Sequence, residues 1–273
     1  MIALAGKTAR AVCAAVCAAL LVLPAGLFMP GIKRALYGAA PTAANHPPAR
    51  VSVTLKEGDY VLFGRYLGEP ILWRVIAVEG GKPLLFSEYV LCFKAFAACA
   101  RPPEASGDWR SSALRQWLNS PRAAVPWSGD PPTAANIYEG RNAYAREPGF
   151  LYGFSAGELA LIEPGEDRVF LLTRGQLRQL PAARRKKAPT KAALRQDDSP
   201  YLFVRPTSWY WATDPVATSA ASVCAVTGKG TFYKSLAADG MNGVCPALRL
   251  AGRAAWAAGG DGGRHRPYEI AGE

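Results

Sequence analysis

After residue 50, the chain alternates between short apolar blocks and turn residues. The blocks are rich in β-branched and aromatic residues and are bounded by glycine or proline, a pattern that is typical of strands. The first three blocks follow one another closely, which predicts an antiparallel meander with a tight turn at residues 79–82. The expected strands are 59–66, 70–78, 83–91, 168–173, one centred on 210–212, 221–226 and 243–250.

Two segments have helical spacing instead. Within residues 108–119, Leu114, Trp117 and Leu118 share one face at i, i+3 and i+4. Ser155 and Glu158 form a capping-box pattern, which predicts a second short helix. Between the two helices lies the Pro-rich stretch 120–148, which has no periodicity. Loops of this length are often functional or mobile, so the stretch is a candidate functional segment.

The chain begins with a long apolar run. Residues 11–32 carry no charge, and Lys7 and Arg10 precede them. A membrane-spanning helix needs about 20 apolar residues and a secretory signal about 7–15. The run fits a membrane anchor, or a cleaved signal peptide if Pro24 ends the helix. Either alternative predicts a domain outside the cytoplasm, held at the cell membrane through the N-terminal segment or secreted.

Changes in composition mark the expected domain boundaries. Residues 1–38 are the signal anchor or signal peptide, and residues 39–50 are a linker rich in proline and alanine. The folded domain is expected at 51–251. Residues 252–273, rich in glycine and arginine, are expected to be a disordered tail. The basic residues of 183–195 are interpreted as a solvated loop, with a contact to an anion or to anionic lipid as the alternative.

Charge and composition exclude several functions. The net charge is +11, but five of the 32 basic residues precede residue 51, so the domain is only moderately basic and nucleic acid is not an expected partner. The two histidines, His46 and His265, fall in the linker and the tail, which argues against a Ser-His-Asp or Cys-His device and against a histidine-rich metal site. Asp239 and Asn242 are isolated candidates for calcium. We therefore expect no metal and no cofactor.

Several blocks, in this order, carry a resemblance to a known family. They are 63–66 (FGRY), 71–75 (ILWRV), 84–88 (LLFSE), 109–119 (WRSSALRQWLN), the helix at 154–162, 169–173 (VFLLT), Trp211 and 243–248 (GVCPAL). Through them, residues 57–251 resemble a bacterial extracytoplasmic domain of unknown function, the family numbered 6273. The sequence departs from this family twice. Ala212 follows Trp211, and Cys245 lies in the closing strand, where the family has arginine at both positions.

The order of the blocks is also similar to the C-type-lectin-like fold. The resemblance implies an α+β domain with a mixed, mainly antiparallel sheet, two short flanking helices and long loops, here preceded by one N-terminal apolar helix. Outside the cytoplasm, paired cysteines usually form disulfides. We expect one bridge between Cys92 and Cys99, and a second between Cys224 and Cys245, on late strands that the fold would bring close.

The late half of the domain, where C-type-lectin-like modules place their ligand surface, is rich in aromatic residues. Strand alternation predicts that Trp209 and Trp211 are buried on one face and that Tyr210 is presented on the other. The candidate ligand-binding residues are Tyr210, Thr213, Asp214 and Tyr233. The leading hypothesis is a non-catalytic extracytoplasmic module that binds a glycan, a peptide or a partner protein. The alternatives are an oxidoreductase of the formylglycine-generating type, which would use Cys224 and Cys245, and a structural cell-surface protein.

Overall fold

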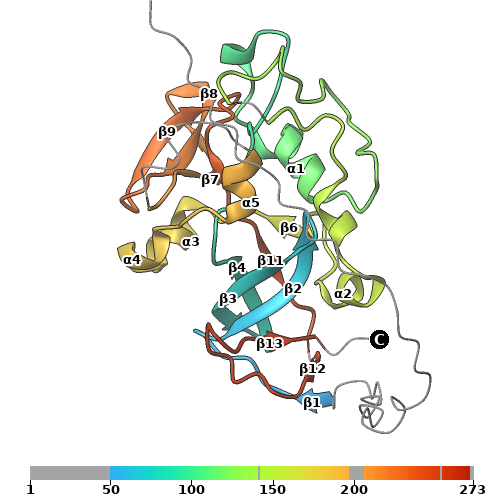
Figure 1. Ribbon diagram of the computed structural model, residues 1–273. Coiled ribbons are helices and arrows are strands. Elements are labelled where there is room, and N and C mark those ends of the chain that lie inside the picture. The colour runs from blue at the N-terminus through green and yellow to red at the C-terminus, as the bar shows by residue number, and fades with distance from the viewer. Residues whose placement is uncertain (1–49, 141, 197–205, 253, 271–273) are drawn as a thin grey trace, which may run out of the picture. The chain divides into compact units, whose positions relative to one another are not determined.

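The computed structural model describes residues 50–140, 142–196, 206–252 and 254–270 (Figure 1). The chain divides into two units, residues 1–45 and 46–273, and every described residue lies in the second. The N-terminal apolar helix expected within 1–38 therefore lies outside the described residues. None of the helices in the described ranges has the length and apolar character that a membrane span requires.

The larger sheet contains the predicted meander. Strands β2 (Tyr60–Tyr66), β3 (Glu69–Glu79) and β4 (Lys82–Ser87) pair antiparallel in sequence order. Three short strands complete the sheet in the order β13-β2-β3-β4-β11-β6, namely β6 (Val169–Phe170), β11 (Ala247–Arg249) and β13 (Tyr268–Glu269). Only the β2–β13 pair in this sheet is parallel.

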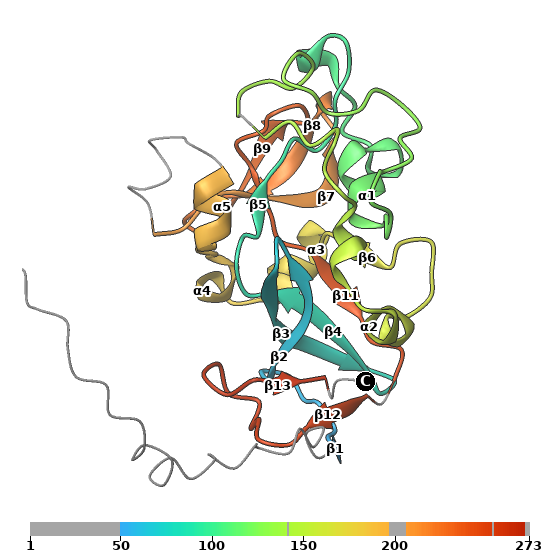
Figure 2. The same cartoon turned by 45° about the vertical axis from the view of Figure 1, so that its right-hand side comes forward.

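A second sheet has the order β5-β10-β7-β8-β9. Its strands are β5 (Cys92–Phe93), β7 (Tyr210–Val216), β8 (Ser219–Val226), β9 (Phe232–Leu236) and β10 (Gly243–Val244). The two sheets are joined by one antiparallel pair of segments. β4 leads into β5 and β10 leads into β11, while β4 pairs with β11 and β5 with β10. The chain bends at residues 88–91 and 245–246, where it passes from one sheet to the other (Figure 2).

Both predicted helices form, and each is short. α1 (Ala113–Leu118) begins at Ser112, whose hydroxyl accepts a hydrogen bond from the Arg115 N–H, and it follows the 3₁₀ turn η2 (Trp109–Ser111). α2 (Ala156–Leu161) has the complete capping box of Ser155 and Glu158. The other helical elements are η1 (Pro102–Glu104), η3 (Phe150–Gly153), α3 (Arg174–Gln179), α4 (Ala182–Arg185) and α5 (Lys191–Gln196). The structure confirms a mixed α/β fold made mostly of sheet, with a few short helices and long loops.

Four tryptophans are fully buried and anchor the core: Trp73, Trp117, Trp211 and Trp256. Buried indole N–H groups need an acceptor. Those of Trp73, Trp117 and Trp211 donate to backbone carbonyls at 2.7, 2.9 and 2.8 Å. The carbonyls bound by Trp117 and Trp211 belong to the distant residues Pro148 and Lys94, so these two indoles also attach loop segments to the core.

The C-terminal segment differs from the expectation of a disordered tail over 252–273. Residues 255–257 form β12, which pairs antiparallel with β1 (Arg50–Ser52), and β13 pairs with β2. Figures 1 and 2 both show β12 and β13 beside the N-terminal strands. Trp256 is 1% exposed and contacts the ring of Tyr268. Two aromatic anchors therefore order a segment whose average composition, dominated by glycine, suggested none.

The long stretch 120–148 has little regular structure but is attached to the core. Val125, Ile137 and Tyr144 are buried. The Tyr144 hydroxyl donates to the carbonyl of Ala95 at 2.7 Å, and the Tyr138 N–H donates to that of Ala238 at 2.7 Å. Aromatic and aliphatic anchors therefore hold a segment that has no helix or strand of its own.

Candidate binding groove beside helix α5

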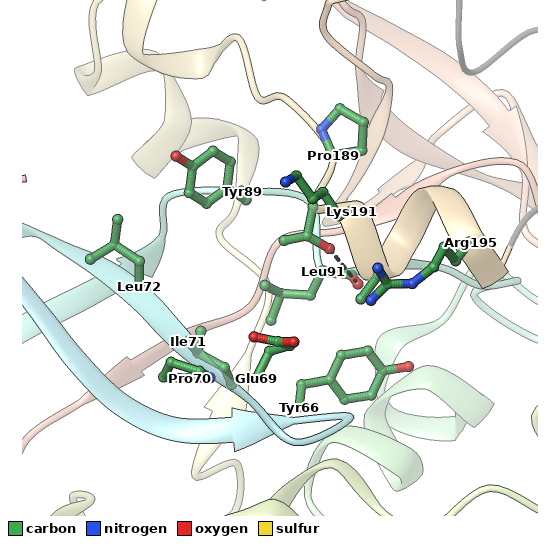
Figure 3. Close-up of a pocket in the computed structure, with 12 residues that line it drawn as sticks. Tyr66, Glu69, Pro70, Ile71, Leu72, Tyr89, Leu91, Pro189, Lys191 and Arg195 are labelled. Atoms are coloured by element: carbon green, nitrogen blue, oxygen red, sulfur yellow. Dashed lines mark hydrogen bonds between the residues drawn. The ribbon is translucent and has the colours of Figure 1, made fainter. Parts of the chain in front are cut away.

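A groove of about 570 Å³ lies between the β2–β3 turn and α5 (Figure 3). α5 is fixed here because Thr190 caps it. The Thr190 hydroxyl accepts a hydrogen bond from the Ala193 N–H at 3.0 Å, and the Thr190 N–H donates to Val90 at 2.9 Å. Ala192 and Ala193 face the interior, and α5 lies beside β5 (Figure 2). The helix thus turns its other side toward the groove.

The floor of the groove is apolar and its ends are aromatic. Ile71 and Leu91 are buried beneath it, and Pro70, Leu72 and Pro189 extend the apolar surface. Tyr66 and Tyr89 lie at opposite ends (Figure 3). Such a surface favours a ligand with an apolar portion, because apolar area removed from water contributes about 25 cal/mol per Å².

Charged side chains border this apolar floor. Lys191 and Arg195 are four residues apart on α5, so they lie on one face of the helix, and Glu69 lies on the opposite wall. The Arg195 guanidinium and the Glu69 carboxylate extend toward the same space (Figure 3). Over the described ranges, none of these three side chains forms a hydrogen bond or an ion pair. Their charges are therefore available to a ligand.

A second cavity of about 490 Å³ adjoins the groove and shares Tyr66 with it. Its wall comes from the β2–β3 turn and from η3. Leu67 and Tyr152 on its rim are large apolar side chains that are more than half exposed. Tyr66 thus separates two neighbouring hollows, and the pair forms an extended surface rather than a closed pocket.

A polar cluster, here called the Lys94 cluster, lies behind Tyr66, with Tyr66 and Lys94 buried and its other members partly buried. It consists of Tyr66, Lys94, Asn142, Glu147 and Gln196. The Tyr66 hydroxyl donates to Glu147 at 2.9 Å, and the Gln196 amide reaches both Glu147 and Tyr66 at 3.3 and 3.2 Å. Burial raises the pKa of Tyr66 well above 10.0. The cluster therefore links the last residue of α5 to the wall of both cavities.

A second buried lysine lies at the bend between the sheets. Lys187 donates to the carbonyl of Ser87 at 2.8 Å and lies 3.9 Å from Glu88, which also pairs with Arg264 at 3.5 Å. Burial lowers the pKa of Lys187. Cys245, which occupies a position where the resemblance expects arginine, is buried close by, and burial raises its thiol pKa to about 12. A lysine from a different segment thus supplies positive charge next to this position.

The four ligand-binding residues expected from the sequence do not line either cavity. Tyr210 is 1% exposed, and its hydroxyl donates to the carbonyl of Arg185 at 2.9 Å. Thr213 donates to Leu171 at 3.1 Å, and the Asp214 carboxylate accepts the Arg174 N–H at the start of α3. Tyr233 is 60% exposed on β9, against Trp209. Three of the four therefore form hydrogen bonds that stabilise the fold, and Tyr233 is the most exposed of the four.

The four cysteines in the described ranges are free thiols, and neither expected disulfide is formed. Cys224 lies on β8 and Cys245 directly follows β10, with β7 between these strands. Two strand spacings separate their backbones by about 10 Å, beyond the ~7 Å limit for a bridge. The chain between Cys92 and Cys99 hydrogen-bonds along residues 237–244, and both thiols are free.

Sequence reasoning missed the groove because its residues come from three short, dissimilar segments, 66–72, 89–91 and 189–195. The basic stretch 183–195, interpreted as a solvated loop, forms α4 and α5. The available signal was the i, i+4 spacing of Lys191 and Arg195 around the small residues Ala192 and Ala193. No cluster of three or more potential metal ligands occurs within the ranges that the structure describes.

The fold and the groove together define a class: a sheet-rich mixed α/β domain with an amphipathic, charged surface groove. The chain belongs to the family described as Domain of unknown function (DUF6273), whose model matches residues 80–252. The search of curated proteins found no match, and neither did the search of solved structures. The C-type-lectin-like assignment therefore stays a prediction.

Proposed function

We propose that this chain is a non-catalytic binding module that holds an acidic, partly apolar peptide segment in the groove beside α5. The observation that carries the proposal is the pairing of two unengaged cations, Lys191 and Arg195, with an apolar floor. An arginine forms strong, directional hydrogen bonds with a carboxylate, and a nearby lysine adds a second positive charge.

A peptide fits this groove better than a glycan does. Sugar rings commonly stack on an exposed aromatic face, whereas Tyr66 of this groove is buried. Here Ile71, Leu72 and Leu91 supply aliphatic area, and the polar groups are mainly charged. Glu69 on the opposite wall suits a basic side chain or an N–H group of the same ligand. The groove thus favours a ligand with alternating acidic and aliphatic side chains.

We propose further that the module works outside the cytoplasm, anchored or exported through the apolar run 11–32. This supports a role in capturing peptide segments of surface or exported partners. The formylglycine-generating alternative gains no support, because Cys224 and Cys245 are buried two strands apart. Burial raises the thiol pKa of both, the opposite of what an activated thiolate requires.

The test is a binding measurement on the full chain with a synthetic peptide array in which glutamate and leucine alternate, beside the same peptides with lysine in place of glutamate. We expect the acidic series to bind in preference and to weaken as salt is raised. The double variant Lys191→Ala and Arg195→Ala should lower affinity about tenfold or more, because each lost charged hydrogen bond contributes about 1.5 kcal/mol.

The matched control is Lys186→Ala, which removes an exposed cation that precedes α5 and does not line the groove. This variant should bind the acidic peptides with an affinity within about twofold of the wild type, since an isolated surface charge contributes little. Equal binding by the acidic and basic series, or affinity that is unchanged in the double variant, would contradict the proposal.

A further inference from the structure

The Lys94 cluster brings together three side chains that can react with one another. Lys94 is completely buried, and its ammonium group lies between the rings of Trp117 and Tyr144, 4.6 and 4.4 Å from their centres. It forms an ion pair with the Glu147 carboxylate. On its other side, the Lys94 Nζ lies 3.5 Å from the carboxamide Oδ1 of Asn142. An amine, a carboxamide and a carboxylate are thus in contact within an aromatic enclosure.

The two segments that carry these groups are held together independently of Lys94. The Asn142 Nδ2 donates to the carbonyl of Phe93 at 2.8 Å, and the Tyr144 hydroxyl donates to that of Ala95 at 2.7 Å. These bonds flank Lys94 on both sides along the backbone. The carboxamide is therefore fixed beside the amine, and such positioning can supply a large part of an activation barrier.

The attack needs an uncharged amine, and the Glu147 carboxylate in contact with Lys94 is the group that can take its proton. Removing an ammonium group from water is costly, and a buried charge is often relieved by proton transfer to its partner. The contact between Lys94 and Glu147 provides that transfer directly. A neutral lysine amine is a nucleophile, and the adjacent carboxamide carbon is an electrophile that a carboxylic acid can activate by protonating its oxygen.

We propose that Lys94 and Asn142 join through an intramolecular amide bond, with Glu147 as the proton carrier. Glu147 takes one proton from the Lys94 ammonium, and the Nζ electron pair then attacks the Asn142 Cγ to form the Nζ–Cγ bond. A second Nζ proton moves to Nδ2 as the Cγ–Nδ2 bond breaks, and ammonia leaves. The first proton passes from Glu147 to solvent or to the departing ammonia. No atom changes oxidation state.

The surroundings of the cluster suit this reaction. The Glu147 side chain is 17% exposed and lines the cavity that adjoins the groove, so both the proton and the ammonia have a route out. The new bond would tie the long stretch 120–148 to the segment that follows β5. Since the described cysteines form no disulfide, it would be the covalent link between these two parts of the domain.

Mass spectrometry of tryptic peptides from the purified full chain tests the bond. Arg141 and Arg146 bound a peptide that contains Asn142. We expect this peptide to be attached to the one that contains Lys94, with no cleavage after Lys94 and a combined mass lower by one ammonia. Lys187, the other buried lysine, has no asparagine side chain among its contacts and should be cleaved normally after denaturation.

Three variants decide the role of each group. Asn142→Ala and Lys94→Arg should each abolish the linked peptide, and Glu147→Gln should reduce it at least tenfold because the amide cannot take the proton. Misfolding could also remove the linked peptide in these variants, so Asn142→Asp serves as the control. It retains an electrophilic carbonyl and would yield the same linked peptide by loss of water. Unlinked peptides with normal cleavage after Lys94 throughout the wild-type sample would overturn the proposal, as would a link that persists in Asn142→Ala.

Discussion

At the scale of single residues, the two buried lysines show how differently the fold treats the same side chain. Lys94 is enclosed by aromatic rings and contacts a carboxylate directly. Lys187 depends chiefly on the backbone carbonyl of Ser87 and on the ring of Phe86, and Glu88 lies farther away at 3.9 Å. The charge of Lys187 is therefore less well compensated, and burial lowers its pKa.

This lowered pKa predicts a pH dependence of stability. The unfolded chain keeps a lysine pKa near 10.5, so between the folded and unfolded values it binds more protons than the folded chain. The free energy of unfolding should therefore gain a contribution that rises with pH in this window. Urea unfolding of the wild type and of Lys187→Met, from neutral pH to about pH 10, should show this contribution in the wild type alone. A constant difference between the two proteins would contradict it.

For single residues, the sequence predicts correctly which face of a strand a side chain occupies. The alternation along β7 does separate Trp211 from Tyr210, since the two belong to different apolar clusters. Tyr210 was nevertheless expected to be presented to a ligand. Both faces of this sheet are covered, so alternation determines which cluster a side chain joins and not whether solvent reaches it.

At the scale of elements, the β2–β3 hairpin carries a bulge that contacts Glu158 and Phe154. The register shifts between Leu62 and Arg65, and Gly64 there has a φ of +67°. Its N–H donates to Glu158 at 2.6 Å, which is also the capping-box residue of α2. A Cβ at this position would lie 2.2 Å from the Phe154 ring. The bulge therefore joins the hairpin to α2.

We predict that Gly64→Ala lowers the free energy of unfolding by about 3 kcal/mol, because it combines backbone strain with overpacking. The matched control is Gly68→Ala, where φ is also positive, at +81°, but no atom lies within 4 Å of the added Cβ. It should cost only about 1 kcal/mol. Equal midpoints of urea unfolding for the two variants would show that the Phe154 contact is unimportant.

Elements with many apolar positions were predictable, and short charged ones were not. In the meander and in α1, several large apolar residues recur at the spacing of a strand or a helix. The local sequence pattern therefore agrees with the tertiary packing. α5 has only six residues, and just two alanines face the core. Its position is set by contacts with β5 and by the bridge between Val90 and Pro189, which are separated by about a hundred residues of sequence. No local pattern encodes such contacts.

At the scale of the whole domain, the C-terminal segment belongs to the folded unit. Trp256→Ala should destabilise the protein by about 3–5 kcal/mol, the usual cost of truncating a buried tryptophan. The exposed Tyr152→Ala should change stability by no more than about 0.5 kcal/mol. Chemical denaturation of the full chain checks both. If Trp256→Ala behaves like Tyr152→Ala, the segment does not contribute to the core.

The pairing of β1 with β12 and of β2 with β13 also governs when the domain can fold. These contacts span nearly the whole described chain, so they carry a large loop-closure entropy and a high contact order, which slow folding. During synthesis, the first two strands emerge long before their partners. The edge of the larger sheet therefore stays open until residues 268–269 have left the ribosome, and the sheet is incomplete up to that point.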